Sequence, residues 1–580
     1  MKQLLKYFKH YKWASFFGPT FKLVEALLEL SVPMLVATII DQAIPSGEMN
    51  QVLRYIAIMF GVAVLGMAFS LTAQYCSAKA AVGFTKELGS ALFHHIIHLP
   101  KKEQDSVSSS SLVTRMTSDL FQIQAGLNLF FRLFLRSPFV VAGSFIMAVN
   151  IDRRMTLYFL GMIVLLTIVV VGVLYLSTPL HKTIREDLDQ LVTLTREQIQ
   201  GIRVIRAFRQ EDKEIKSFRQ QNKRLADNQI KVGRLNVLTG PLTYVIVNVT
   251  LILVIWQGGF YINAGSLTQG QLVALVNYLL AILIELVKIA HFVMQLNRGL
   301  SSARRVVEVM EREVESEEFE HTTAAEFSKQ AFAEDIALMF NDVSYTYPEA
   351  NEPSLRNLDF VIQAGDFVGV TGSTGSGKTT LISLITKSYD PTTGQVNFNP
   401  QLFDVTTRRH LRERVSVVPQ RATLFHGTIR SNLLQGKPDA TDAEMWQALD
   451  ASQASEFVRN QAKGLDAPVE AFGRNFSGGQ RQRLTIARAL IKPAQILILD
   501  AATSALDYVT EANFQRVLRE QYQHLTVIMV SERTHSIQAA DQIIVLDEGR
   551  QIGLGSHAEL LENNNIYREI YNSQQVLEAT

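Results

Sequence analysis

The sequence predicts two kinds of fold in one chain: an α-helical domain with six transmembrane spans, followed by an α/β P-loop domain. The first observation is a set of long uncharged stretches confined to residues 1–300. The second is a glycine-rich loop at residue 372, placed between an apolar strand and a helix. At 580 residues the chain has room for several domains. The predicted boundaries are a membrane domain over 1–300, a linker over 301–334 and a second domain over 335–580.

The composition excludes several classes of protein. Lys and Arg total 56 and Asp and Glu total 55, so no basic excess points to nucleic acid as a partner. The single Cys76 cannot form an intrachain disulfide. The N-terminus, MKQLLKYFKHYKW, is basic and amphipathic and lacks the compact apolar core of a signal peptide. We expect it to lie as a helix on the cytoplasmic membrane surface.

The six spans follow from length and charge. About 20 mostly apolar residues cross a bilayer as a helix. Residues 55–78 and 155–180 carry no charge, and the uncharged stretch 235–284 is long enough for two spans. Two weaker candidates are centred on residues 27–40 and 128–150. The chain is therefore predicted to be a multi-pass membrane protein.

The loops predict the orientation of these spans. The segments 79–127 and 181–234 are long, polar and helix-like, and the second is rich in Lys and Arg. Because basic loops stay on the cytoplasmic side, we expect both long segments there. Six crossings then leave the N- and C-termini cytoplasmic.

Several ionisable residues fall within the spans, where such residues are functional candidates. Glu285 and Lys288 lie three apart on one helix face and could pair with each other. Glu285 either lines a substrate path or belongs to a structural ion pair. Four others lie toward the cytoplasmic ends of spans and are expected to be solvated or packing residues: Glu25, Glu29, Arg132 and Arg136.

The loop GSTGSGKTT, from Gly372, matches the phosphate-binding pattern G-x-x-x-x-G-K-[ST] in its required context. Glycines let backbone N–H groups turn toward phosphates, and the helix N-terminus adds a positive dipole end. Lys378 is predicted to reach the β- and γ-phosphates of ATP and Thr379 to bind Mg²⁺. The predicted ATP-binding residues are Tyr347, Gly372, Ser373, Thr374, Gly375, Ser376, Gly377, Lys378, Thr379, Thr380, Gln420 and Asp500.

Three of these residues lie outside the loop. Tyr347, in VSYTYP, could stack on adenine, although a lone aromatic residue more often packs in a core. Gln420 ends the predicted strand VSVVPQ and could reach the metal or the attacking water. Asp500 closes the strand ILILD. With Thr379, Gln420 and Asp500 form the predicted Mg²⁺ site.

A second phosphate cradle is predicted in FSGGQRQRLTIARAL, where Ser477, Gly478, Gly479 and Gln480 open a helix. One ATP cannot use both cradles of the same chain without bending it severely. A second nucleotide-binding domain, facing the first head to tail, satisfies the geometry.

Together GSTGSGKTT, VVPQ, FSGGQ and ILILD, in this order, resemble the ABC transporter superfamily, specifically exporter half-transporters with six spans and one ABC nucleotide-binding domain. The resemblance implies that two halves dimerise around two ATP molecules, each held between the loop of one chain and the signature of the other. Asp507 then faces the partner across the dimer. The segment from Glu197 to Phe208 resembles the family's coupling region; otherwise it is an ordinary amphipathic helix.

Departures from the family pattern put catalysis in doubt. Ala501 stands where the family has its catalytic glutamate, and Glu532 stands at the switch-histidine position. His535 is a disfavoured substitute. Ala471 and Phe472 replace a common Glu-Arg pair before the signature. No catalytic residue of this chain's own site is therefore intact, although its ATP-binding groups remain.

This pattern resembles the degenerate-site subunit of a bacterial heterodimeric multidrug exporter. It implies an ATPase-coupled translocase in the plasma membrane that moves amphipathic drugs or lipids. The implied partner is a second half-transporter with an intact glutamate, whose active site the FSGGQ signature completes. Two alternatives stay open: a non-hydrolysing ATP-gated sensor, and a homodimeric exporter in which Ala501 was introduced. Glu532 argues against the latter, and the cargo is not identified.

Overall fold

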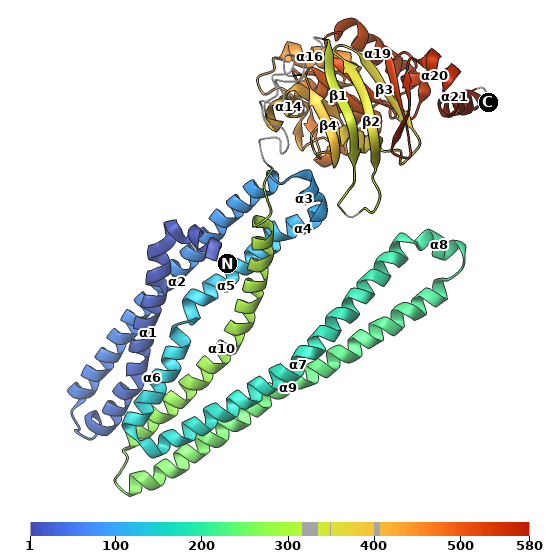
Figure 1. Cartoon of the computed structure of the whole chain (residues 1–580). Helices are drawn as coiled ribbons and strands as arrows, with labels where there is room; N and C mark the ends of the chain where they lie inside the picture. Colours follow the sequence, from blue (N-terminus) through green and yellow to red (C-terminus); the bar gives the residue numbers. More distant parts are fainter. Residues whose placement is uncertain (1, 316–334, 349, 400–406, 579–580) are drawn as a thin grey trace. The chain divides into compact units, whose positions relative to one another are not determined.

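The computed structural model describes residues 2–315, 335–348, 350–399 and 407–578, which form two compact units (Figure 1). One unit contains Met1–Ile97 and Ser108–Arg312. The other contains His98–Val107 and Glu313–Thr580. The predicted linker 301–334 begins inside the last helix of the first unit, and its residues 316–334 lie outside the described residues.

All the secondary-structure elements described in the first unit are helices. Six of its helical stretches are long and apolar enough to cross a membrane, which confirms the six-span fold. The elements are η1 (Lys2–Tyr11), α1 (Lys12–Thr38), η2 (Ile39–Ala43), α2 (Met49–Ile97), α4 (Ser109–Thr114), η3 (Arg115–Asp119), α5 (Leu120–Leu133), α6 (Arg136–Ile151), α7 (Arg153–Gln200), α8 (Ile202–Ala207), α9 (Glu211–Asn263) and α10 (Gln269–Met310).

The third span is broken between α5 and α6. Pro138 lacks an N–H group, so it cannot bond the carbonyl of Phe134 one turn earlier. The helix accordingly stops at Leu133 and restarts at Arg136. The break places Arg136 in the first turn of α6, within the membrane region.

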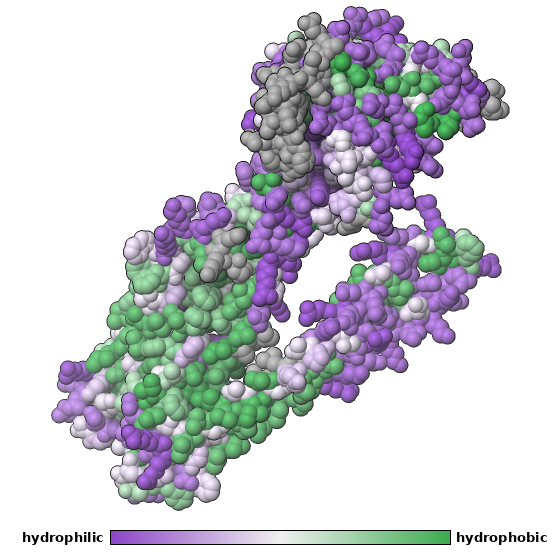
Figure 2. Space-filling model, in the orientation of Figure 1, coloured by the Kyte–Doolittle hydropathy of each residue, from purple (hydrophilic) through white to green (hydrophobic). Residues whose placement is uncertain are grey.

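Helices α7 and α9 run side by side and are joined at one end by the short α8 (Figure 1). Apolar residues gather over the end of this pair away from α8, and polar residues toward it (Figure 2). In the polar part, the buried carboxylate of Asp187 accepts a hydrogen bond from Asn228 Nδ2 at 2.7 Å and pairs with Arg224 Nε at 2.9 Å. The prediction of a long polar helical segment over 181–234 is confirmed.

The second unit is built on a mixed sheet of nine described strands, in the order β4-β1-β2-β11-β10-β3-β9-β8-β5. β3 pairs in parallel with β9 and β10, and β8 with β5 and β9. β1 pairs antiparallel with β2 and β4. The strands are β1 (Ile336–Tyr345), β2 (Leu355–Gln363), β3 (Phe367–Gly372), β4 (Thr393–Phe398), β5 (Val415–Val418), β8 (Ile496–Asp500), β9 (Thr526–Val530), β10 (Gln542–Asp547) and β11 (Arg550–Gly555).

Helices and shorter elements complete this unit. They are α3 (Lys101–Ser106), α12 (Lys378–Ile385), α14 (Arg408–Arg414), β6 (Gly427–Thr428), α15 (Ile429–Leu433), α16 (Asp442–Ala451), α17 (Ser455–Arg459), η4 (Gly464–Asp466), β7 (Pro468–Val469), η5 (Ala471–Gly473), α18 (Gly478–Leu490), α19 (Tyr508–Gln521), η6 (Thr534–Ser536), α20 (His557–Asn563) and α21 (Asn565–Glu578).

The sheet explains why distant motifs meet. β3 and β9 are buried along their whole length and β8 in its first four residues, as expected for central parallel strands covered on both faces. Parallel strands end at one edge of a sheet. The loop after β3, the Asp500 end of β8 and the segment after β9 are therefore neighbours at that edge.

Candidate functional site

The loop after β3 has a backbone that only glycine fits well. Gly372 has φ +151° and Gly377 has φ +99°. A Cβ at Gly372 would lie 2.0 Å from the Leu546 carbonyl oxygen, and one at Gly377 would lie 2.5 Å from Leu355 Cδ2. These close approaches shape the turn that leads into α12.

Lys378 opens α12 and is held by the loop itself. Its ammonium donates to the carbonyl oxygens of Gly372 (2.9 Å) and Ser373 (2.8 Å). Glu532 Oε1, at 3.9 Å, is its one ion-pair neighbour among the described residues. Burial lowers the pKa of Lys378, while the charges of Glu532 and Asp500 act in the opposite direction. A cation without a hydrogen-bonded anion in a glycine loop fits an incoming phosphate.

The predicted Mg²⁺ ligands are hard oxygen donors near this loop. Asp500 ends β8 and, in the part of the chain that the structure describes, makes no side-chain hydrogen bond or ion pair. Burial raises the pKa of Asp500, while Lys378 opposes the increase. Thr379 is exposed beside Lys378, and exposed Gln420 lies two residues beyond β5. A half-buried unpaired carboxylate with these oxygens fits a bound Mg²⁺, which would help neutralise the phosphates of ATP.

Tyr347 is tied to the loop rather than fully buried. Its hydroxyl lies 3.2 Å from Thr380 Oγ1. Its ring contacts Tyr345 and Tyr389 edge-to-face, with centroids 4.9 and 5.4 Å apart. The residue is half-buried, so it packs against the core and still presents a ring beside the phosphate-binding loop. Its adenine-stacking role stays a prediction.

Two of the departures from the family pattern, Ala501 and Glu532, lie at the same sheet edge. Ala501 has φ +46°, and its N–H donates to the Val530 carbonyl at 3.0 Å. A residue with a Cβ in this left-handed region costs on the order of 1 kcal/mol. The Glu532 side chain is 67% exposed, and its Oε1 atom lies 3.9 Å from Lys378 Nζ. The disfavoured substitute His535 packs edge-to-face on Tyr508, with ring centroids 6.0 Å apart.

The second predicted cradle begins α18. Ser477 is its N-cap: Ser477 Oγ accepts from the Gln480 N–H at 3.3 Å, and Gln480 Oε1 accepts from the Ser477 N–H at 2.9 Å. This reciprocal cap fixes the turn. Ser477 and Gly478 remain exposed in this chain. Just before them, Phe472 is 65% exposed with φ +61°, a strained presentation of a large ring.

Asp507 caps a neighbouring helix, α19. Its carboxylate accepts hydrogen bonds from the Thr510 N–H (2.9 Å) and the Thr510 hydroxyl (2.8 Å). These bonds lower the pKa of Asp507. The side chain is exposed, so the predicted contact with a partner remains open to it.

The neighbours of the nucleotide loop on the side of β10 are not predicted from the sequence. Ser373 Oγ donates to Asp547 Oδ1 at 3.0 Å. A polar pocket of about 720 Å³ adjoins the loop at Gly375 and is also lined by Arg356, Asp547 and Arg550. Its sequence signal is the polar stretch DEGR after an apolar strand, which predicts no more than a turn.

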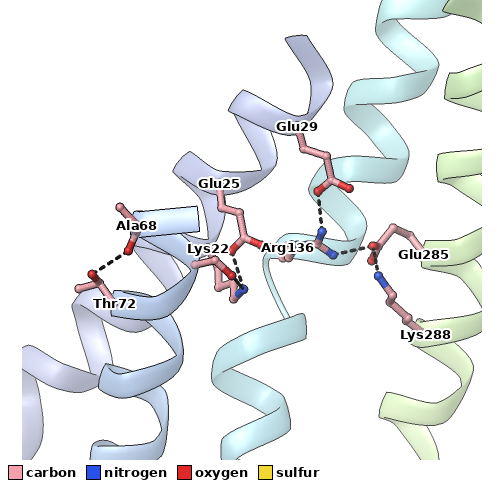
Figure 3. A network of polar contacts seen from close by, with 9 residues as sticks. Lys22, Glu25, Glu29, Ala68, Thr72, Arg136, Glu285 and Lys288 are labelled. Atoms are coloured by element: carbon pink, nitrogen blue, oxygen red, sulfur yellow. Dashed lines mark hydrogen bonds and ion pairs between the residues drawn. The ribbon is translucent and has the colours of Figure 1, made fainter. Parts of the chain in front are cut away.

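In the membrane unit, Arg136 joins acids from two other helices (Figure 3). Arg136 Nη1 donates to Glu285 Oε1 and Nη2 donates to Glu29 Oε2, each at 2.5 Å. Glu285 also accepts from Lys288 Nζ at 2.7 Å and from Ser137 Oγ at 2.6 Å. The Glu285–Lys288 pairing is confirmed. Arg136 is 8% exposed, so of the two expected roles it is a packing residue and not a solvated one.

The segment Glu197–Phe208 covers the end of α7 and α8. Ile202, Val204 and Phe208 are 44%, 59% and 72% exposed. An amphipathic helix with a purely structural role would bury such side chains within the chain. Their exposure favours a contact surface.

Known proteins resemble this chain over nearly its whole length. The family model "ABC transporter transmembrane region" matches residues 15–287, and the model "ABC transporter" matches residues 355–504. The uncharacterized ABC transporter ATP-binding protein YfiB of Bacillus subtilis is 31% identical over 99% of this chain and 98% of its own. An ATP-dependent lipid A-core flippase of Chromobacterium violaceum is 28% identical over 95% and 93%. A bacterial Atm1-family ABC exporter with ATP bound shares the fold, with a TM-score of 0.77, 21% identity and 98% coverage of both chains.

Proposed function

This chain belongs to the ABC transporter family, and we propose that it is the degenerate half of a heterodimeric exporter. The observation that most favours this proposal is Ala501, the residue that follows β8. It stands beside Asp500 and the phosphate loop, in the place of a general base, and offers only a methyl group. The same chain keeps an ordered, exposed signature at Ser477.

The chemistry of this site favours binding over hydrolysis. A positioned general base contributes about 10² to 10⁴ in rate, or roughly 3 to 5 kcal/mol of barrier. Ala501 cannot accept a proton from the attacking water. Glu532 adds negative charge near Lys378, where the γ-phosphate also brings negative charge. The loop, Lys378, Thr379 and Asp500 still supply the groups that hold ATP and Mg²⁺.

The signature would act on the partner's ATP. The cap between Ser477 and Gln480 preorganises the N-terminus of α18, and helix N-termini bind phosphates. The proposed partner is a second half-transporter with a glutamate after the aspartate that corresponds to Asp500. Asp507, exposed on α19, would face that partner across the dimer.

The membrane unit would form half of an alternating-access pathway in a bacterial plasma membrane, with both termini cytoplasmic. ATP binding would close the dimer, and hydrolysis at the partner's site would reset it. The proposed cargo is an amphipathic drug or lipid. The similarity to proteins named lipid A-core flippases supports lipid cargo. The domain limits proposed are 1–300 and 335–580, with a linker between them.

ATPase rates of the purified full-length chain test the proposal. Alone, the wild type should hydrolyse ATP at close to the background rate. In a co-expressed pair whose partner has Gln in place of its own catalytic glutamate, the double variant A501E/E532H should be faster than the wild-type chain by on the order of 100-fold, because it restores the base and the switch histidine of this chain's site. Equal rates for the two would overturn the degenerate-site reading. Full recovery with A501E alone would favour a homodimer.

The signature has its own test with a co-expressed candidate partner. The pair should hydrolyse ATP, and S477R in this chain should abolish that activity while this chain still binds ATP. Unchanged hydrolysis in the S477R pair would overturn the role of the signature. An active pair that moves no amphiphile across a vesicle membrane would favour an ATP-gated sensor.

A further inference from the structure

Six charged side chains form a continuous network across α1, α6 and α10 (Figure 3). It runs from Lys22 through Glu25 to Arg136, divides to Glu29 and Glu285, and ends at Lys288. Lys22 Nζ lies 2.5 Å from Glu25 Oε2 and 3.1 Å from Ser70 Oγ of α2. The three cations and three carboxylates sum to a net charge of zero.

Three residues of the network, Glu29, Arg136 and Glu285, lie at a similar level within the membrane region. Measured along each helix at 1.5 Å per residue, Glu29 is about 21 Å from Ala43, the last residue before the first short loop. Arg136 is about 22 Å from Ile151, and Glu285 about 24 Å from Gln269. All three distances are shorter than a hydrocarbon core of about 30 Å. The charges are therefore at the depth where ionisable residues are costly and mark a functional path.

Exposure divides the network into a closed centre and two open ends. The side chains of Arg136 and Glu285 are 10% and 3% exposed, whereas those of Glu29 and Lys288 are 51% and 41% exposed. Charged side chains at membrane depth face a protein interior or a water-filled cavity, not lipid tails. The network thus has an accessible carboxylate, Glu29, on one side of the Arg136 guanidinium and an accessible ammonium, Lys288, on the other.

The centre also has one unmet hydrogen bond. Arg136 Nε is buried and has no hydrogen-bond partner; Glu25 Oε1 lies 4.0 Å away. A buried donor of this kind costs free energy until an acceptor approaches. A modest movement of Arg136 toward Glu25 would satisfy Nε and free Nη2 from Glu29. The contact between Arg136 and Glu29 is therefore the one most readily exchanged for a ligand.

Electroneutrality selects the ligand. A net anion or a net cation would leave an uncompensated charge in a low-dielectric region, which is expensive. A headgroup that carries both a phosphate and an ammonium adds no net charge. We propose that this network is a binding site for the zwitterionic headgroup of an amphiphile, with its ammonium on Glu29 and its phosphate on Arg136 Nη2 and Lys288. The proposal rests on the proposed export of amphiphiles and names their chemical class.

Binding to the purified full-length chain in neutral maltoside micelles tests the site without ATP. The probe is a fluorescent single-chain phosphocholine. Its competitors carry the same acyl chain with a phosphocholine, phosphoglycerol, trimethylammonium or maltoside head. Phosphocholine should compete at concentrations about tenfold lower than the other three. E29Q and K288Q should each weaken probe binding by about tenfold and reduce this headgroup preference.

R132Q is the matched control, because Arg132 lies one turn before Arg136 and makes no ion pair among the described residues. It should bind the probe within twofold of the wild type. ATP binding at the nucleotide loop, unchanged in all variants, verifies that they are folded. Absence of saturable binding, equal competition by the four headgroups, or E29Q binding like the wild type would overturn the proposal. Selective headgroup binding, combined with no ATP-driven transport by the assembled pair, would support this site and overturn the proposed export function.

Discussion

The membrane network and the nucleotide loop each surround a cation, and they do so in opposite ways. Arg136 has carboxylate oxygens of Glu29 and Glu285 at 2.5 Å. Lys378 has only uncharged oxygens at hydrogen-bond distance, the carbonyls of Gly372 and Ser373 and, at 3.5 Å, the Ser376 hydroxyl. Its nearest carboxylate among the described residues is 3.9 Å away. A charge that cannot reach water needs its partner within the chain. Lys378 instead has the surroundings of a cation whose anion comes from a ligand. The distance to the countercharge therefore distinguishes a structural ion pair from a phosphate-binding position.

Removing the paired cation should have the largest effect. R136Q leaves Glu29 without its partner and Glu285 with only Lys288 and Ser137. Breaking a buried ion pair costs about 3 to 5 kcal/mol, and we expect the lower end because Glu285 keeps two donors. Thermal unfolding of the full-length chain in detergent measures the loss. R132Q, at a similar depth but unpaired, should change stability by less than about 0.5 kcal/mol. Equal melting of the two variants would contradict the network's role.

Replacing Lys378 should lower the affinity for ATP and leave the stability of the chain nearly unchanged. K378A should weaken ATP binding by about 100-fold, or about 2.7 kcal/mol, since hydrogen bonds to charged groups are the strong ones. Titration with a fluorescent ATP analogue measures this change. K463A removes an exposed lysine far along the chain and serves as the control. If K378A lowered the melting temperature and left ATP affinity unchanged, the contrast with Arg136 would fail.

The carboxylate near Lys378 should set the preference between nucleotides. E532Q should tighten ATP binding by about tenfold and leave ADP binding nearly unchanged, because only ATP places a γ-phosphate near residue 532. The gain is modest, since the Glu532 side chain is 67% exposed and its charge is screened. Competition between ATP and ADP for the fluorescent analogue measures it. E520Q, at an exposed glutamate, serves as a control. An equal change in the affinities for ATP and ADP would contradict an effect of Glu532 on the γ-phosphate.

The smallest effect concerns Asp500 without nucleotide or Mg²⁺. Burial raises the pKa of Asp500 above that of the unfolded chain, so the folded chain binds the proton more tightly. Its contribution is present below the unfolded pKa near 3.8 and is lost as the pH rises through the raised pKa. D500N should therefore be more stable than the wild type at neutral pH, and this difference should shrink toward pH 4. Thermal unfolding between pH 4 and pH 8 measures it; a difference that grows toward acid would contradict the cause given.

The sequence predicted what local chemistry dictates. Charged residues are costly in a bilayer, so long uncharged stretches and two weaker apolar segments predicted six spans. The strand-loop-helix order located the phosphate loop. The sequence could not predict that Lys22, Glu25, Arg136 and Glu285 meet, because more than 100 residues separate Glu25 from Arg136 and nearly 150 separate Arg136 from Glu285. Nor did it reveal the left-handed backbone of Ala501, since alanine carries no signal for that conformation. The roles of the nucleotide-site residues stay predictions.

The paired helices α7 and α9 are much longer than a bilayer is thick, and each contains an internal proline. Their 48 and 53 residues give lengths of about 70 to 80 Å, of which a bilayer needs about 30 Å. Pro179 and Pro241 lie about 39 and 33 Å from the short-loop ends of these helices, so both helices lose a backbone hydrogen bond just outside the hydrocarbon. A swivel of 10° at this joint, acting on the remaining arm of about 35 Å, would carry α8 through about 6 Å. A small bend at this level would therefore move α8 by about the length of one helical turn.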